Sequence, residues 1–90
     1  MTSAKQRIRV SNVCSTFATL WLEPWGEDYG MLGEDEFEVV ASEPEEGFYF
    51  HVGYGAKGMK IYAEGDATEV SVYQNGQLLE CGHNRRREEW

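Results

Sequence analysis

Two histidines and two cysteines are the residues of this chain best suited to metal or acid–base chemistry. Cys81 and His83 lie two positions apart, and His51 could approach them from another strand. Thiolate and imidazole groups are ligands for copper and zinc, so a cupredoxin-like metal carrier is one hypothesis. Blue-copper sites add a weak methionine ligand, however, and no methionine follows Cys81 in this sequence. We therefore expect no bound metal or cofactor.

Recognised catalytic motifs do not occur in the sequence. A nucleophilic triad needs a nucleophile, a base and an orienting group, but neither histidine lies in such a motif and there is no G-x-S-x-G element. The glycine-rich segment 53–58 lacks G-K-S/T, which favours a strand turn over phosphate binding. The acid clusters at residues 34–36 and 43–46 lack the spacing of a calcium loop. We expect a protein that is not an enzyme.

Aromatic side chains are the strongest indication of a binding function. Phe17 and Trp21 fall on the polar side of an expected strand, and five more aromatic residues are candidates for partial exposure: Trp25, Tyr29, Tyr49, Tyr62 and Tyr73. Tryptophan and tyrosine stack on sugar rings and anchor protein interfaces. With two neighbouring acids, they define the candidate binding residues: Trp21, Trp25, Glu27, Asp28 and Tyr29. The alternative is that this strand is central and that the 24–35 loop or the C-terminal tail covers its second face.

The charge of the chain is strongly acidic and unevenly distributed. Sixteen acids against eight bases give a formal net charge of −8, which opposes binding to nucleic acid. Residues 23–46 hold ten acids and no base, whereas six of the bases lie towards the two ends: Lys5, Arg7, Arg9, Arg85, Arg86 and Arg87. If the terminal strands are neighbours, the molecule has an acidic side that could dock to a basic partner. The other interpretation is a merely solubilising acidic surface.

Apolar and polar residues alternate with period two through five stretches, and no stretch keeps a helical period. The apolar sets that share one parity are Ile8 and Val10; Ala18, Leu20 and Leu22; Phe37, Val39 and Ala41; Phe48, Phe50, Val52 and Tyr54; and Met59, Ile61 and Ala63. Because successive strand side chains point to opposite faces, each set needs a second layer to cover it. We therefore expect an all-β fold, a small antiparallel β-sandwich of seven to eight strands with immunoglobulin-like or cupredoxin-like architecture.

Turn residues divide the chain into the expected strands, which lie near 7–13, 16–23, 36–42, 48–54, 59–64, 70–74 and 77–81, with a short strand near 29–32. Asn75–Gly76 is the preferred pair for a two-residue type I′ turn. That turn sets a register in which Val70 faces Cys81, so Cys81 is predicted to point inward, and parity places Cys14 inward as well. Residues 1–90 form a single domain, with loose tails at 1–5 and 85–90.

The expected cellular compartment and the expected oxidation state of the two cysteines both follow from features that the sequence lacks. No run approaches the roughly 18 apolar residues of a membrane span, and residues 1–9 lack the apolar stretch of a signal peptide. We therefore expect a cytoplasmic protein with no membrane partner. The two cysteines have 66 residues between them and form no C-x-x-C pair, which favours buried free thiols over a disulfide.

One segment resembles a known group of sequences. Residues 19–29 read T-L-W-L-E-P-W-G-E-D-Y, and G-E-D-E-F-E-V-V-A follows from Gly33. This resembles short bacterial all-β proteins with a W-L-E-P-W-G-E type motif and no established activity. The resemblance covers about residues 7–75, and it departs at Leu32, where such sequences often have a proline. It implies a bacterial single-domain β protein and carries over no functional residue.

Three function classes remain open from the sequence. The leading hypothesis is a non-enzymatic module that binds another protein through its acidic and aromatic surface. The alternative is a carbohydrate-binding module that uses the same aromatic residues as a stacking platform. The second alternative is the metal carrier built from Cys81, His83 and His51.

Overall fold

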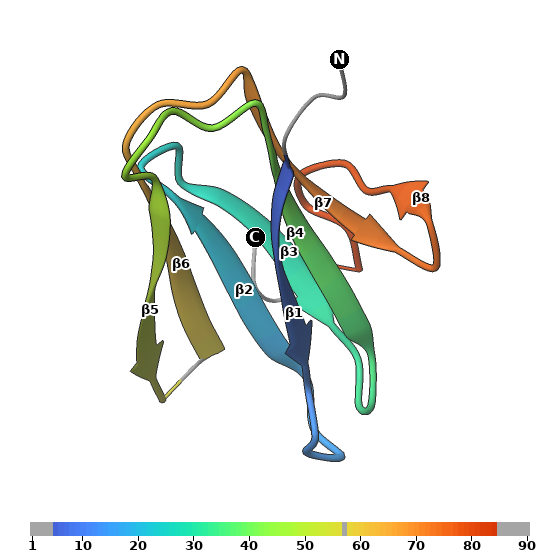
Figure 1. The fold of residues 1–90 in the computed structure, drawn as a ribbon. Helices are drawn as coiled ribbons and strands as arrows, with labels where there is room; N and C mark the ends of the chain where they lie inside the picture. The colour runs from blue at the N-terminus through green and yellow to red at the C-terminus, as the bar shows by residue number, and fades with distance from the viewer. Residues whose placement is uncertain (1–4, 57, 85–90) are drawn as a thin grey trace.

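The computed structural model describes residues 5–56 and 58–84, which form an all-β fold without a helix (Figure 1). The eight strands are β1 (Lys5–Ser11), β2 (Ala18–Glu23), β3 (Glu27–Met31), β4 (Glu36–Ser42), β5 (Tyr49–Gly55), β6 (Gly58–Glu64), β7 (Glu69–Gln74) and β8 (Gln77–Leu78). None of the described residues belongs to a helix that could cross a membrane. The expected strands are all present, with shifts of one to three residues at most ends and a last strand that stops early.

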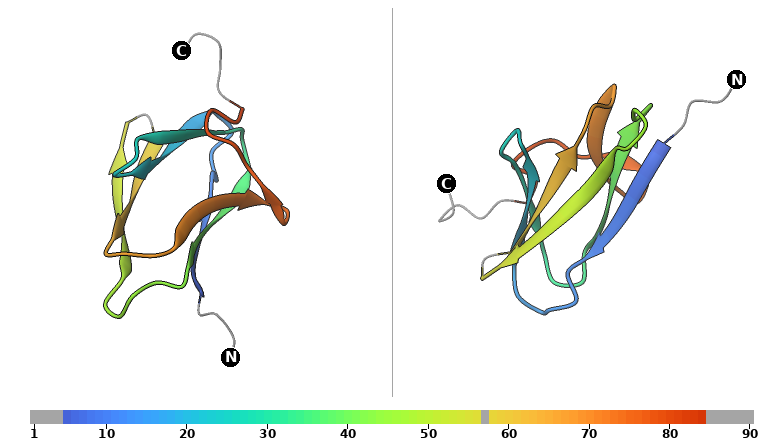
Figure 2. Two further views of the ribbon diagram at one scale, coloured as in Figure 1. Left: turned by 90° about the horizontal axis from the view of Figure 1, so that it is seen from above. Right: turned by 60° about the vertical axis from the view of Figure 1, so that its left-hand side comes forward.

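The strands form two four-stranded sheets that enclose one interior (Figure 2). Sheet A has the order β1-β4-β7-β8, and sheet B has the order β3-β2-β6-β5. The predicted sandwich-like all-β fold is confirmed. Its neighbouring strands run antiparallel except for β2 and β6, which are parallel, so sheet B is mixed rather than purely antiparallel.

The core consists of the apolar side chains that point inward from the two facing sheets. Its main cluster contains Val10, Leu20, Leu22, Tyr29, Met31, Phe37, Val39, Ile61 and Val72. The alternation predicted the inward side correctly for β1, β2, β4, β6 and β7, because burial of one face of a strand requires a period of two. Leu20, Val39, Ile61 and Val72 are each fully buried.

β5 departs from this pattern. Phe48, just before it, is buried and Phe50 is partly buried, but Val52 and Tyr54 are 44% and 83% exposed. The prediction that all four side chains face a dry core is therefore wrong for its last two members. β5 is the edge strand of sheet B, and no described part of the chain covers this end of it.

The final hairpin confirms the turn chemistry but not its length. Asn75 and Gly76 have φ angles of 52° and 78°, as a type I′ turn requires, and Tyr73 pairs with Leu78. β8 ends at Leu78, and residues 81–84 form a turn instead of continuing the strand. Cys81 is consequently exposed, and its predicted inward position opposite Val70 is wrong.

The first strand also ends earlier than expected, at Ser11. Asn12 is buried, and its side-chain amide nitrogen lies 2.8 Å from the carbonyl oxygen of Thr16 and 3.2 Å from those of Met31 and Leu32. The Asn12 backbone still bonds to the segment before β4, since its amide donates to the Asp35 carbonyl and its carbonyl accepts from the Glu34 amide. The side chain ties the loop after β1 to the end of β3. Cys14 therefore lies on an exposed loop rather than in the core, against expectation.

The two expected tails lie mostly beyond the described part of the chain. Lys5 belongs to β1 and not to a tail. The other tail residues, 1–4 and 85–90, fall outside the described residues, as do the three arginines at 85–87.

Parallel pairing of β2 with β6 requires a glycine at position 58. Gly58 pairs with Thr19, and a Cβ atom at Gly58 would collide with the backbone of Thr19. Its φ angle of 149° is also one that other residues rarely adopt. Close approach of the two strands thus depends on the missing side chain.

We expect Gly58→Ala to lower the free energy of unfolding by about 2 kcal/mol or more, because it combines backbone strain with a backbone clash. Gly55→Ala is the matched control, since a Cβ there would come no closer than 4.0 Å to its nearest neighbour, the oxygen of Gly58. Urea unfolding of both variants measures the difference. Equal stabilities would contradict this account of the pairing.

Leu20 tests the core itself. It has no exposed surface, so we expect Leu20→Ala to cost about 2–5 kcal/mol through lost burial and the cavity that remains. Leu32 is 49% exposed, and Leu32→Ala should cost less than about 1 kcal/mol. Chemical denaturation of the two variants under identical conditions compares these losses, and similar losses would be inconsistent with the described core.

Candidate functional site

The five candidate binding residues do not form one patch. Trp21 and Asp28 are cross-strand partners on the outer face of sheet B. Glu27 and Tyr29 have the opposite parity, and Tyr29 is only 4% exposed. Trp25 lies in the turn between β2 and β3 and is 54% exposed. The structure therefore keeps Trp21, Asp28 and Trp25 accessible, and the expected exposure of Tyr29 is wrong.

Tyr29 is a core residue whose hydroxyl retains a polar partner. The hydroxyl donates a hydrogen bond to Glu27 Oε1 at 3.1 Å. Burial, and then the nearby Glu27 carboxylate, raise the pKa of Tyr29 well above its usual range, because a phenolate there would be poorly solvated and repelled. Because it is only 4% exposed, the Tyr29 ring is unavailable for stacking on a ligand.

A groove of about 440 Å³ opens on the outer face of sheet B. Its lining comes from three adjacent strands and the turn between two of them: Trp21, Gly53, Tyr54, Gly55, Ala56, Gly58, Lys60 and Tyr62. The register explains this grouping, since Trp21 of β2 pairs with Lys60 of β6, and Lys60 pairs with Gly53 of β5. We call this feature the sheet B groove.

Glycines make the floor of the sheet B groove, and aromatic rings make its walls. Gly53, Gly55 and Gly58 carry no side chain, so the surface is low where they lie side by side on β5 and β6. A Cβ at Gly53 would lie 3.5 Å from Cε1 of Tyr62, which places the Tyr62 ring against the floor. Trp21 is half-buried on the opposite side.

His51 holds the Tyr62 wall in place. The two rings stack with centroids 5.3 Å apart and a tilt of 30°. Nδ1 of His51 lies 3.7 Å from Oε2 of Glu64, an ion pair when the imidazole is protonated. Both contacts are on the solvent side of the sheet, where they support the Tyr62 ring that lines the groove.

The β3 end of the same face is covered. Gly82 and Gly30 donate backbone hydrogen bonds that join β3 to the 81–84 turn, with Asp28 and His83 as the acceptors. A Cβ at Gly30 would lie 2.7 Å from Cζ of Phe17, so Phe17 packs over this position. β2 is central in sheet B, as the alternative interpretation held. The 24–35 segment supplies β3, which lies beside β2 and does not cover its second face, and the tail at 85–90 lies outside the described residues.

The proposed metal ligands are far apart. Cys81 and His83 lie in the turn that docks on β3, whereas His51 is on β5 at the opposite edge of sheet B. The His83 ring packs edge-on against Phe37, 6.1 Å between centroids. Within residues 5–56 and 58–84, no three histidines, cysteines or acids gather as a metal site would require. The geometry gives no support to a carrier built from these three residues.

The Cys81 thiol has a structural neighbour instead. Its Sγ lies 3.5 Å from Oδ1 of Asp28. Partial burial raises the pKa of Cys81, and the Asp28 carboxylate adds to this effect. The raised pKa makes the thiolate, the nucleophilic form of cysteine, scarcer at neutral pH.

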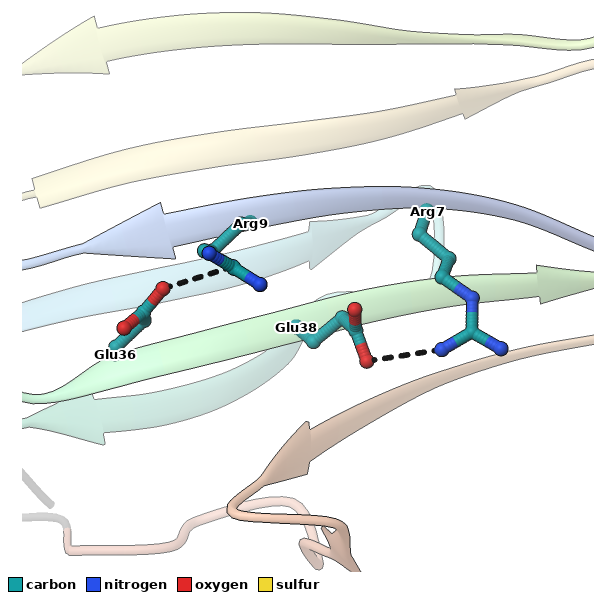
Figure 3. A network of polar contacts seen from close by, with 4 residues as sticks. All are labelled: Arg7, Arg9, Glu36 and Glu38. Atoms are coloured by element: carbon teal, nitrogen blue, oxygen red, sulfur yellow. Dashed lines mark hydrogen bonds and ion pairs between the residues drawn. The ribbon is translucent and has the colours of Figure 1, made fainter.

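The acidic stretch does not form one acidic side. β1 pairs with β4, so Arg9 lies 2.9 Å from Glu36 and Arg7 lies 3.2 Å from Glu38 on the outer face of sheet A (Figure 3). Asp35 accepts a hydrogen bond from the Leu32 amide at 2.9 Å. Bases and acids alternate across these strands, and the predicted separation of charge is wrong for β1.

Part of the groove escaped the sequence analysis. Parity assigns Tyr54 to the core, and the glycines of segment 53–58 indicate only a turn. The available signal was the polar parity of the 59–64 strand, which carries Lys60 and Tyr62. The sequence does not predict that β2 lies beside β6, because the two segments are distant in the chain and pair in parallel.

Comparisons with protein-family models, with curated proteins and with solved structures find no significant match to this chain. The resemblance to short bacterial β proteins therefore stays a prediction. The geometry of the sheet B groove is the basis on which a function can be assigned.

The raised pKa of Tyr29 predicts an alkaline loss of stability. Below pH 10, the usual pKa of tyrosine, the side chain is neutral in both states and this stability is fully present. Above pH 10 the Tyr29 hydroxyl ionises in the unfolded chain but stays neutral in the folded protein, because its pKa is raised there. The free energy of unfolding therefore falls as the pH rises through this range. At pH 11 the loss is about 1 kcal/mol.

Tyr29→Phe should remove this contribution, whereas Tyr49→Phe, at a position 55% exposed, should leave it unchanged. The free energy of unfolding at pH 9 and pH 11 gives the comparison. If Tyr29→Phe and the unaltered protein lose the same stability over this interval, the account of the Tyr29 site is wrong.

Proposed function

We propose that this protein is a non-enzymatic binding module that recognises another protein through the sheet B groove. One observation carries the proposal, namely that Trp21, Tyr54 and Tyr62, from three strands, line one hollow with a glycine floor. Tryptophan and tyrosine dominate the energetics of protein interfaces because each buries a large rigid surface. A hollow of about 440 Å³ can seat an anchoring side chain of a partner.

The charge around the groove indicates the chemistry of the partner. Lys60 is exposed and forms no ion pair with any described residue, while Asp28 lies on the other side of Trp21. A partner segment with an aromatic or aliphatic anchor and a carboxylate near it fits this arrangement. Such a charge contributes orientation and specificity more than affinity.

Binding rather than catalysis is favoured by the state of the two histidines. His51 stacks on Tyr62 and faces Glu64, and His83 packs on Phe37. Neither side chain is hydrogen-bonded to a serine, threonine or cysteine side chain within the described parts of the chain. This supports the proposal that the groove acts by recognition.

Carbohydrate binding is the second candidate, favoured by aromatic walls over a flat floor. Sugar hydroxyls need side chains that accept and donate hydrogen bonds, because an unpaired hydroxyl is costly to bury. The described residues that line the groove include no Asp, Glu, Asn or Gln. This lining suits an apolar anchor better than a sugar ring, and the protein partner is preferred.

We also propose a cytoplasmic, bacterial setting without nucleic acid as a partner. Cys14 and Cys81 are exposed free thiols, and such thiols persist in a reducing compartment. The net charge of −8 repels phosphate backbones. The bacterial origin rests on the sequence resemblance alone.

A peptide selection tests the protein-binding proposal. Peptides from a random display library are selected on the immobilised protein, and their affinity is measured by fluorescence titration. We expect Trp21→Ala and Tyr62→Ala to weaken binding by about tenfold or more, since each removes an anchoring wall. Trp25→Ala is the matched control, because Trp25 is exposed but lies outside the groove, and it should retain the affinity.

Two outcomes would overturn this proposal. In one, Trp25→Ala weakens peptide binding as much as Trp21→Ala. In the other, no peptide is retained, but soluble polysaccharides change the tryptophan fluorescence of the protein and not of Trp21→Ala, which would establish the carbohydrate alternative.

A further inference from the structure

The four sheet edges of the molecule differ in how they are protected. Unpaired backbone N–H and C=O groups at an edge can pair with another chain, and proteins usually prevent this with charges, short strands or covering segments. β1 carries Lys5, Arg7 and Arg9, and β8 has only two residues. β3 is hydrogen-bonded to the 81–84 turn. Three of the four edges are therefore blunted.

β5 has none of these protections. It is seven residues long and contains no lysine, arginine, aspartate or glutamate. Among the described strands it lies at the outer edge of sheet B and pairs with β6 alone (Figure 1). None of its residues is fully buried. Tyr49, Val52 and Tyr54 are 55%, 44% and 83% exposed, so large apolar side chains of this one strand reach solvent on both faces.

We infer that β5 is a self-association edge, at which it pairs antiparallel with β5 of a second copy of the chain. The paired strands join two B sheets into one sheet of eight strands. A two-fold axis at Val52 places this residue opposite its own copy and Phe50 opposite the second copy's Tyr54. Aromatic and β-branched cross-strand pairs of this kind stabilise antiparallel strands. The exposed half of β5 thereby acquires the apolar partner that sheet A does not provide.

A second copy is the occupant that the charges favour. The molecule is acidic overall, with a net charge of −8, and two copies repel one another over most surfaces. β5 is free of charged residues other than a titratable His51, which would lie opposite Gly53 in this register. Symmetric pairing here brings no like charges into direct opposition, and two-fold dimers are the commonest homo-oligomers.

The edge and the sheet B groove can be tested separately. Val52 does not line the groove, and its parity is opposite to that of Trp21 and Tyr62 across the paired strands. A change at Val52 therefore alters the dimer contact without altering the groove walls.

Sedimentation velocity of the full chain over about 10 µM to 1 mM measures the association. We expect a species of twice the 10.3 kDa chain mass. Val52→Lys should raise the dissociation constant by about tenfold or more, because it sets two like charges opposite each other. Leu78→Lys is the matched control, since Leu78 is 60% exposed and lies on β8 of sheet A, in the other sheet from β5.

Val52→Glu provides a second variant at the same position, which does not line the groove, and thermal unfolding confirms that each variant remains folded. The inference stands if both Val52 variants are monomeric while Leu78→Lys still dimerises. A wild-type chain that stays monomeric over the whole range, that forms open-ended aggregates, or that dimerises equally with lysine at position 52 would overturn it.

Discussion

The parallel contact between β2 and β6 is the constraint on which the sheet B groove depends. It joins segments almost forty residues apart in sequence, and it places Trp21 next to Lys60 and Glu23 next to Tyr62. The contact is possible because Gly58 leaves space for the backbone of Thr19. The same glycine contributes to the groove floor, so one missing side chain serves both strand pairing and surface shape.

The two outer faces of the sandwich have different physical characters as a result. Sheet A exposes alternating charges, and its Arg–Glu pairs each contribute little stability because water screens them. They keep the β1 edge polar and unsuited to strand addition. Sheet B exposes rings, glycines and an uncharged edge strand. The exposed aromatic rings and the uncharged edge thus lie on one of two sheets that share a single core. The two sheets face each other in Figure 2.

Hydrogen bonds formed near the ends of strands account for most of the wrong predictions from sequence. The Asn12 side chain bonds to the carbonyls of Thr16 and Met31 just after β1, and Cys14 lies exposed in the loop that follows. The 81–84 turn pairs with β3, which removes Cys81 from the hairpin. Tyr29 has a polar hydroxyl and lies near acids in the sequence. It is nevertheless buried, because its hydroxyl donates a hydrogen bond to the Glu27 carboxylate. The alternation of apolar and polar residues along a strand does not indicate which hydrogen-bond partners its end residues will find.

Local chemistry determined the strands, the Asn75–Gly76 turn and the inward side of the core strands, because each depends on neighbours a few residues away. Leu20, Val39, Ile61 and Val72 are buried as their parity requires. The pairing of β2 with β6, the groove that this pairing creates and the exposure of β5 were decided only in three dimensions. Strand order depends on which distant segments meet, and alternation along one strand is the same whichever neighbour it has.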